Sequence, residues 1–84
     1  MPVFPTTAYF RHTRTRPDRA MIRDAWILRA IHEPLAEEIQ TDGRIRRWVR
    51  IPEFENRMLR VILLPDGQTV HNAFFDRGLR ESEL

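Results

Sequence analysis

Two Asp-Gly pairs, Asp42-Gly43 and Asp66-Gly67, constrain the fold of this chain more than any other feature of its sequence. An Asp-Gly pair between segments of β-type residue pattern is the strongest short-range signal for a hairpin turn. The first pair separates LAEEIQT (35–41) from RIRRWVRI (44–51). The second separates MLRVILL (58–64) from QTVHNAFFD (68–76). The sequence therefore predicts two β-hairpins and at least four antiparallel strands.

The segment before the first hairpin has the properties of a helix. DRAMIRDAWILRAI (18–31) contains no helix-breaking residue, Pro17 suits its first turn, and Pro34 ends it. Its apolar residues occupy more than one face of the predicted helix. This indicates that one face packs on a sheet and that another face is buried by a further surface, such as that of a partner. TAYFRHT (7–13) is aromatic and β-branched, and we expect that it could form an additional first strand.

These elements predict an α+β fold with one main helix packed on a four- to five-stranded twisted antiparallel sheet. The chain of 84 residues is long enough for one small domain, 1–84, with a thin core. We expect residues 1–7, which include two Pro, to be a loosely ordered lead-in, and residues 78–84 to be a tail.

The composition excludes several classes of protein. There is no Cys, hence no disulfide scaffold, no thiolate zinc site and no cysteine nucleophile. No apolar run reaches the roughly 18 residues of a membrane span, and the start of the chain does not resemble a secretory signal. We therefore expect a cytoplasmic protein. A Gly-rich phosphate loop, a Ser-centred elbow and a metal-type His spacing are all missing, so we expect no cofactor and no metal.

All fourteen basic residues are Arg and none is Lys. A GC-rich genome would explain this bias, but the distribution of the charge is informative in itself. Residues 11–29 and 44–60 each carry six Arg, whereas residues 33–42 and 61–84 are predominantly acidic. Guanidinium groups bind phosphate and carboxylate in a planar, bidentate geometry. The two basic blocks are therefore the candidate anion-binding segments.

Strand alternation predicts which of these charges share a face. Four residues of segment 44–51 fall on one face, namely Arg44, Arg46, Trp48 and Arg50. A two-residue turn at Asp66-Gly67 makes Arg60 and His71 diagonal neighbours. It also places Asn72 on the apolar face. A two-residue turn at Asp42-Gly43 places Arg47 on the apolar face opposite Glu38, where the two would form an ion pair.

This face is a candidate RNA-binding surface. The arginines would neutralise phosphates, Trp48 would offer a stacking surface, and His71 would titrate near neutral pH. The alternative is a solvated sheet face with ion pairs to Glu37 and Glu38, and with Trp48 in a second small core. His71 would then be a half-buried strand residue without chemistry.

A second basic cluster precedes the predicted helix. His12 and Arg16 lie in FRHTRTRPDR (10–19), and a helix N-terminus with nearby Arg is a natural phosphate site. A flexible basic arm explains the same pattern. His32 falls near the helix C-terminus, where we expect a cap that suits the helix dipole and no chemistry.

The order of the motifs resembles a known group of proteins. An early His and an Arg-Pro-Asp helix start are followed by DGRIRRW (42–48), LRV (59–61) and TVHNAFFDR (69–77). This pattern is similar to that of the short DUF4258 proteins and, more remotely, of BrnT and the RelE/ParE superfamily of toxin–antitoxin toxins. The likeness covers roughly residues 9–80. It departs from RelE-like toxins in having no Lys and only one predicted helix where they commonly have two.

The resemblance implies a type II toxin that acts as a metal-independent endoribonuclease. Such proteins cleave RNA, free or on the ribosome, by attack of the 2′-hydroxyl, and a small antitoxin protein neutralises them. The Arg of the central strand would be Arg60, and the functional position of the last strand would be His71 or Asp76-Arg77. His71 would then serve as acid or base, with Arg46 and Arg60 holding the phosphate.

The resemblance also leaves other functions open. A ParE-like member would inhibit gyrase, and His71 would be dispensable for it. A non-enzymatic module could instead bind nucleic acid or protein through the same face. The assembly implied is a dimer or a toxin–antitoxin hetero-oligomer.

The residues predicted to contact RNA are Arg44, Trp48, Arg50, His12, Arg16 and Arg77.

Overall fold

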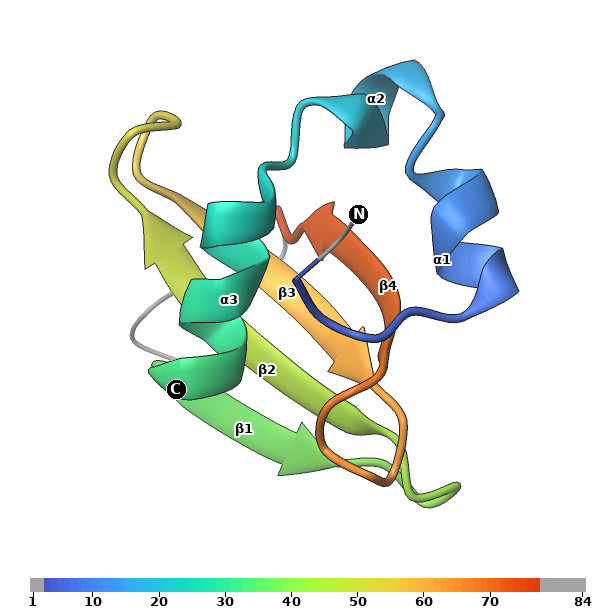
Figure 1. Ribbon diagram of the computed structural model, residues 1–84. Coiled ribbons are helices and arrows are strands. Elements are labelled where there is room, and N and C mark those ends of the chain that lie inside the picture. Colours follow the sequence, from blue (N-terminus) through green and yellow to red (C-terminus); the bar gives the residue numbers. More distant parts are fainter. Residues whose placement is uncertain (1–2, 78–84) are drawn as a thin grey trace.

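The computed structural model describes residues 3–77 and confirms the α+β class (Figure 1). Three short helices come first: α1 (Ala8–Thr13), α2 (Pro17–Ala20) and α3 (Asp24–His32). Four strands follow, and they form one antiparallel sheet in the order β1-β2-β3-β4. Their bounds are β1 (Ala36–Ile39), β2 (Ile45–Ile51), β3 (Arg57–Leu63) and β4 (Val70–Phe75). The predicted tail, 78–84, lies outside the described residues.

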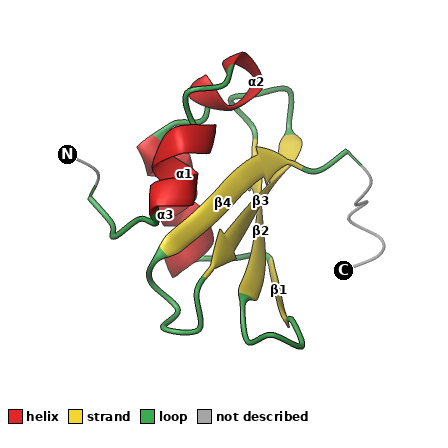
Figure 2. Ribbon diagram, turned by 90° about the vertical axis from the view of Figure 1, so that its right-hand side faces the viewer, coloured by secondary structure: helices red, strands yellow, loops and turns green. Residues whose placement is uncertain are grey.

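The helices and the sheet form two layers. Figure 2 shows the three helices on the same side of the sheet. The core lies between the layers, where Trp26, Ile27 and Ala30 of α3 meet inward-facing residues of the strands. Those strand residues include Val49, Ile51, Leu59, Val61, Leu63, Val70 and Ala73. No helix within residues 3–77 is both long and apolar enough to cross a membrane.

The predicted single helix over residues 18–31 is wrong, because the chain breaks it in two. α2 ends at Ala20 and α3 begins at Asp24. Between them the chain turns, and Ile22 enters the core with 4 % of its surface exposed. Arg14 donates to Asp24 Oδ1 at 2.6 Å and ties the start of α3 to the end of α1. These tertiary contacts override a local helix preference that is itself weak.

The additional strand expected over residues 7–13 is a helix instead. The Thr7 hydroxyl accepts the backbone N–H of Phe10 at 3.1 Å and caps α1. Strand-like pairing in this region is limited to a single parallel bridge between Thr6 and Val70. Phe4 is 6 % exposed, so residues 3–7 are anchored to the core and are not the loose lead-in that we expected. An N-cap and two buried Phe, Phe4 and Phe10, outweigh the β-propensity of the segment.

The turn of the first hairpin is one residue longer than predicted. Gln40 N donates to Arg44 O, which leaves three residues in the loop, with Gly43 at φ +89°. Three-residue hairpin loops commonly place Gly at a left-handed position of this kind. The register therefore pairs Glu37 with Arg47 and Glu38 with Arg46, and the expected Arg47–Glu38 pairing is wrong.

The second hairpin begins in the predicted register and then slips. Leu63 lies opposite Val70, as a two-residue turn at Asp66-Gly67 requires, but a bulge follows, and Ile62 lies opposite Asn72. Ala73, rather than Asn72, therefore takes the core position, with 4 % of its surface exposed. A two-residue turn at Asp66-Gly67 would set Arg60 opposite Ala73, but after the bulge Arg60 lies opposite Phe74. The slip decides which side chains reach the face of the sheet away from the helices.

Candidate functional site

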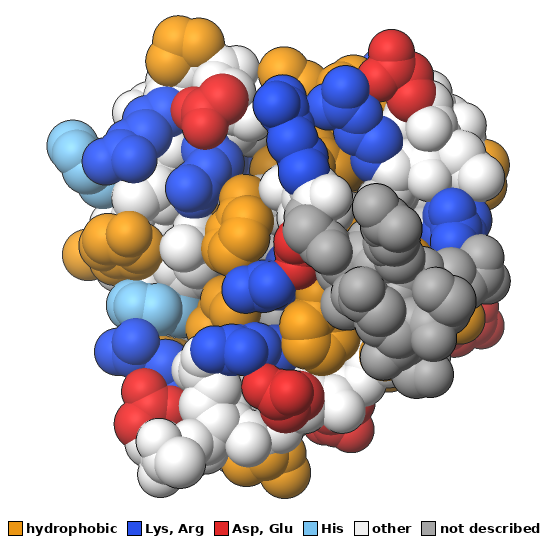
Figure 3. Space-filling model, turned by 180° about the vertical axis from the view of Figure 1, so that it is seen from behind, with side chains coloured by type: hydrophobic (Ala, Val, Ile, Leu, Met, Phe, Trp, Pro, Cys, Tyr) orange, Lys and Arg blue, Asp and Glu red, His pale blue; other side chains and the backbone are white. Residues whose placement is uncertain are grey.

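The face of the sheet away from the helices carries a gathering of Arg and His side chains, interleaved with apolar ones (Figure 3). An open pocket of about 400 Å³ lies on this side, between the start of α1, the β1–β2 hairpin and strands β3 and β4. Its lining residues are Tyr9, Gln40, Arg44, Arg46, Arg60, Ile62, His71, Asn72 and Phe74. The three proposed catalytic residues, His71, Arg60 and Arg46, thus lie around one pocket, and Arg44 joins them.

His71 reaches this pocket through the β-bulge. The register moves from Leu63–Val70 to Ile62–Asn72, which leaves His71 as the extra residue of β4. A bulge re-aims side chains in this way and is often found beside active sites. Thr7 Oγ1 lies 3.1 Å from His71 Nδ1, and the ring of Tyr9 stacks on the imidazole at 4.9 Å with 23° between the planes. α1 therefore holds the imidazole on two sides.

The surroundings of His71 favour its neutral form. Partial burial lowers the pKa of the imidazole below its usual 6.5, and the positive charge of Arg44 lowers this pKa further. Asp42 acts in the opposite direction. At neutral pH the ring is therefore uncharged and can accept a proton or a hydrogen bond.

Arg46 and Arg44 line the pocket from the first hairpin. Arg46 donates to Glu38 Oε1 at 2.9 Å, and the amide oxygen of Gln40, when it faces Arg46, accepts from Nε and Nη2 at 2.6 and 2.7 Å. Arg44 Nε lies 3.7 Å from Asp42 Oδ2. These contacts are exposed, so each stabilises the fold little and each arginine can exchange its carboxylate for a phosphate.

Arg60 is held more firmly than the other two. It forms an ion pair with Asp76, whose side chain is 8 % exposed, and its guanidinium lies over the rings of Trp48 and Phe74 at 5.4 and 5.2 Å. Arg60 Nε is buried and has no hydrogen-bond partner. Arg19 covers Phe74 as well, at 5.2 Å, and donates to Asn72 Oδ1 at 2.7 Å.

Trp48 does not form the exposed stacking surface that we expected. Its ring is 6 % exposed, and its Nε1 donates to Asp76 Oδ2 at 3.1 Å. Met58 and Ile62 are also buried outside the main core cluster, with 5 % and 8 % of their surface exposed. The burial of Trp48 therefore agrees with the alternative, in which this residue lies in a second small core. The ion-pair part of that alternative holds for Glu38, which pairs with Arg46 on this face. Glu37 pairs instead with Arg47 on the helix side of the sheet.

The remaining predicted RNA-binding residues do not line the pocket. Arg50 donates to the backbone oxygen of Asn56 at 3.1 Å, near the opposite end of β2. His12 and Arg16 are exposed around the end of α1 and the start of α2. Arg77 borders a separate hollow, together with Phe54. No three His, Asp or Glu side chains within the described part of the chain are grouped as a metal site requires.

Sequence reasoning missed Thr7 and Tyr9 as neighbours of His71. Both lie in a segment whose residue types favour a strand, and their contacts with His71 span more than sixty residues of sequence. The Thr-Thr pair at 6–7 was the available signal, since Thr is a good N-cap. Gln40 was missed because the three-residue turn moved it beside Arg46.

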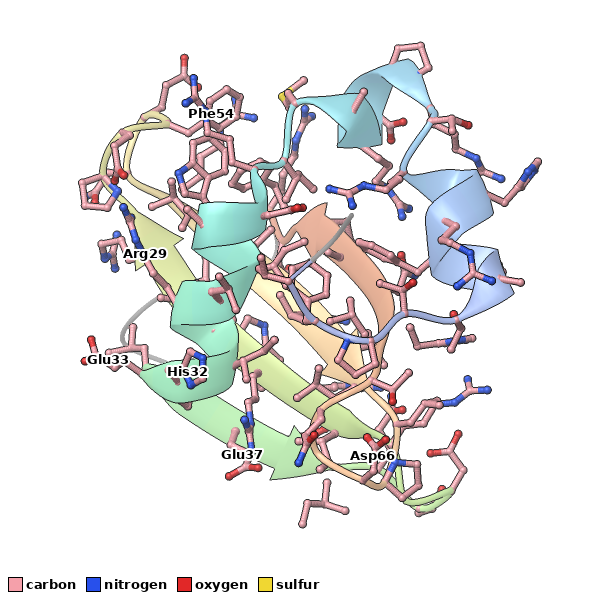
Figure 4. All side chains as sticks on the ribbon, viewed as in Figure 1. Arg29, His32, Glu33, Glu37, Phe54 and Asp66 are labelled. Carbon is pink, nitrogen blue, oxygen red and sulfur yellow. The ribbon has the colours of Figure 1, made fainter. Side chains whose placement is uncertain are left out.

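Arg47, by contrast, is structural. It lies on the helix side of the sheet, where Nη1 donates to the backbone oxygen of Ile31 at 2.8 Å and Nη2 lies 3.2 Å from Glu37 Oε1. His32 ends α3 on that same side, at the position expected for a cap (Figure 4).

Comparisons of this chain with protein-family models, curated proteins and solved structures give no match.

Proposed function

We propose that this protein is a toxin-type endoribonuclease, similar to DUF4258 and BrnT-like members of the RelE/ParE superfamily, that binds RNA in the pocket beside β4 and cleaves it. One observation carries the proposal: a single pocket gathers a neutral imidazole, His71, with the three cations Arg44, Arg46 and Arg60. Phosphodiester cleavage by an internal hydroxyl needs a base and cations in that proximity.

The reaction that fits these groups is attack of the ribose 2′-oxygen on the adjacent phosphorus. His71 takes the proton of the 2′-hydroxyl, the new P–O2′ bond forms, and the P–O5′ bond breaks. The leaving 5′-oxygen takes a proton from solvent, which the open pocket admits. The products are a 2′,3′-cyclic phosphate and a 5′-hydroxyl. Arg44 and Arg46 neutralise the phosphate, and Arg60 supplies positive charge at the pocket wall.

In the proposed mechanism, Thr7 selects the ring nitrogen of His71 that acts as the base. Its hydroxyl oxygen accepts the Phe10 N–H and has a second lone pair that can accept from His71 Nδ1–H. In that tautomer Nε2 carries the free lone pair. Thr7 is therefore a positioning residue in the proposed mechanism, comparable to the groups that orient histidines in other active sites.

Replacement of His71 tests the catalytic role. We expect His71→Gln to reduce cleavage of single-stranded RNA by roughly 100-fold or more, the usual contribution of a general base. His32→Gln is the matched control, because His32 lies at the end of α3 on the helix side of the sheet (Figure 4). Gel analysis of end-labelled RNA measures the rate and identifies the cyclic phosphate. Unchanged cleavage by His71→Gln contradicts the assignment.

The pH dependence gives an independent check. A base must be unprotonated, so kcat/KM should rise through the pKa of His71, which lies below 6.5, and then level off toward neutral pH. A profile still rising above pH 6.5 would assign the base to another group. Arg60→Ala should lower the rate without moving this acid limb, provided that the variant remains folded by circular dichroism.

The second candidate is a non-enzymatic module that binds RNA or protein through the same pocket. One observation favours it: among the lining residues within 3–77, His71 is the one whose side chain ordinarily titrates near neutral pH, so those residues offer no second such group to act as the acid. Salt-dependent RNA binding without any cleavage would select this module. Loss of DNA supercoiling on expression would select the ParE-like, gyrase-directed alternative.

The proposed partner of the toxin is a small antitoxin protein, and its proposed place of action is the cytoplasm. An acidic antitoxin would cover the basic face that carries Arg44 and Arg46 and would block RNA. A short neighbouring reading frame whose product relieves growth arrest supports the toxin functions, both the RNA-directed and the gyrase-directed one.

A further inference from the structure

We propose that Tyr9 is the platform on which a nucleobase of single-stranded RNA stacks, next to the phosphate held in the pocket. This inference rests on the proposed RNA function and assigns a specificity role to a residue other than His71 and the three arginines of the pocket. It also moves the aromatic contact from β2, where the sequence indicated Trp48, to α1.

Tyr9 offers a ring that is both ordered and accessible. One face of the ring stacks on His71 at 4.9 Å, while 48 % of the residue surface is exposed. Phe10, the next residue, is 2 % exposed and fixes α1 in the core. A base that stacks on the accessible part of the ring would therefore meet a surface that needs little ordering.

The other aromatic rings of the site cannot serve in this way. Trp48 is 6 % exposed and has Arg60 over its ring. Phe74 lines the pocket, but Arg19 and Arg60 lie over its ring, each at 5.2 Å. Of the two described residues with a phenyl or phenol ring that line the pocket, Phe74 is covered by guanidinium groups, and Tyr9 has none over its ring from residues 3–77.

The geometry also sets the class of ligand. Tyr9 borders the same pocket as Arg44 and Arg46, so a phosphate between the arginines would have its neighbouring base near the tyrosine ring. Paired bases are already stacked on each other and are not free to stack on a side chain, whereas single strands expose them. Stacking on an aromatic ring tolerates every base, so we expect preference for single strands with little sequence preference.

The test separates stacking from simple support of His71. The probe is a short 2′-O-methyl oligouridine, which cannot undergo 2′-hydroxyl attack, and its counterpart is the same 2′-O-methyl sugar-phosphate strand without bases. Fluorescence anisotropy at low salt measures both dissociation constants. The variants are Tyr9→Ala and Tyr9→Phe, with Leu35→Ala as control, because Leu35 is also 48 % exposed and does not line the pocket.

We expect Tyr9→Ala to weaken binding of the oligouridine by roughly 5- to 150-fold, the range measured for a stacked base, and to leave binding of the base-free strand unchanged. Tyr9→Phe and Leu35→Ala should bind both strands as the parent does. Equal weakening on both strands, or no weakening on either, overturns the proposal and leaves the RNA function intact. A parent protein that binds neither strand overturns the RNA function, and the role of Tyr9 with it.

Discussion

Arg60 is the residue whose surroundings constrain it most. Its guanidinium is placed between two rings and an almost fully buried carboxylate, Asp76, which also accepts the indole N–H of Trp48. Such a pair contributes orientation more than net stability, because the desolvation of both charges offsets their attraction. The cluster fixes one cation at the wall of the pocket, whereas Arg44 and Arg46 remain free to exchange partners.

Removal of the carboxylate is therefore expected to be costly. Asp76→Ala leaves the guanidinium of Arg60, whose side chain is three-quarters buried, and the indole N–H of Trp48 without this acceptor. We expect a loss of about 2–3 kcal/mol in the free energy of unfolding, below the range for a fully buried pair because Arg60 retains some contact with water. Urea denaturation measures this loss. In the control, Asp18→Ala, the removed side chain is 75 % exposed, and the loss should stay within about 0.5 kcal/mol.

At the scale of elements, the two hairpin turns carry the geometry of the site. The first turn places Gln40 and Glu38 beside Arg46. The second hairpin contains the bulge that directs His71 into the pocket. Asp66 stabilises the second turn by accepting from the backbone N–H groups of Gln68 and Thr69 and from the Thr69 hydroxyl, and these bonds lower the pKa of its carboxyl group.

The two turn glycines should differ in their tolerance of alanine. Both have positive φ, +89° at Gly43 and +72° at Gly67, which strains an L-residue by about 1–2 kcal/mol. At Gly43 an added Cβ would also lie 3.2 Å from Pro65 Cγ, whereas at Gly67 the nearest atom is 3.9 Å away. Gly43→Ala should therefore lower the free energy of unfolding more than Gly67→Ala. Equal urea midpoints would show that contact with Pro65 is without consequence.

At the scale of the whole molecule, one ion pair joins the two layers at their edge. Arg29 of α3, which is labelled in Figure 4, donates at 2.9 Å to Oε1 of Glu53, a residue of the loop that follows β2. This hydrogen bond is the largest of the interactions, with a backbone hydrogen bond and the positive charge of Arg29 among the others, that lower the pKa of the Glu53 carboxyl group from 4.5 to about 2. Residues 24 positions apart do not keep this contact in an unfolded chain, so the shift belongs to the folded state.

Stability should therefore depend on pH through Glu53. Because the folded pKa is lowered, the folded state binds this proton less readily than the unfolded state does. The contribution of the pair is present above pH 4.5 and is lost as the pH falls toward 2. Glu53→Gln should flatten the dependence of the urea midpoint on pH in that window. Glu55→Gln, which replaces a carboxylate that is 68 % exposed, should leave the dependence as in the parent.

Local patterns in the sequence determined the sheet. The Asp-Gly pairs and the alternation around them predicted two hairpins and at least four antiparallel strands. Pro17 and Pro34 bounded the segment that contains α2 and α3, whereas α1 was not predicted. These signals act between residues close in sequence, so they can be read without the tertiary structure. They also placed Arg46, Arg60 and His71 on one side of the sheet, and in the structure all three line the pocket.

Only the tertiary structure decided the register, the helix break and the environment of His71. A turn longer by one residue moved Arg47 from Glu38 to Glu37, and a bulge exchanged Asn72 for Ala73 in the core. Thr7 and Tyr9 meet His71 because α1 packs on β4, a contact between distant segments that no local pattern encodes. The physical reason is that local propensities differ by about 1 kcal/mol or less per residue, while burial of a large side chain such as Phe10 contributes about 1.5–3 kcal/mol and overrides them.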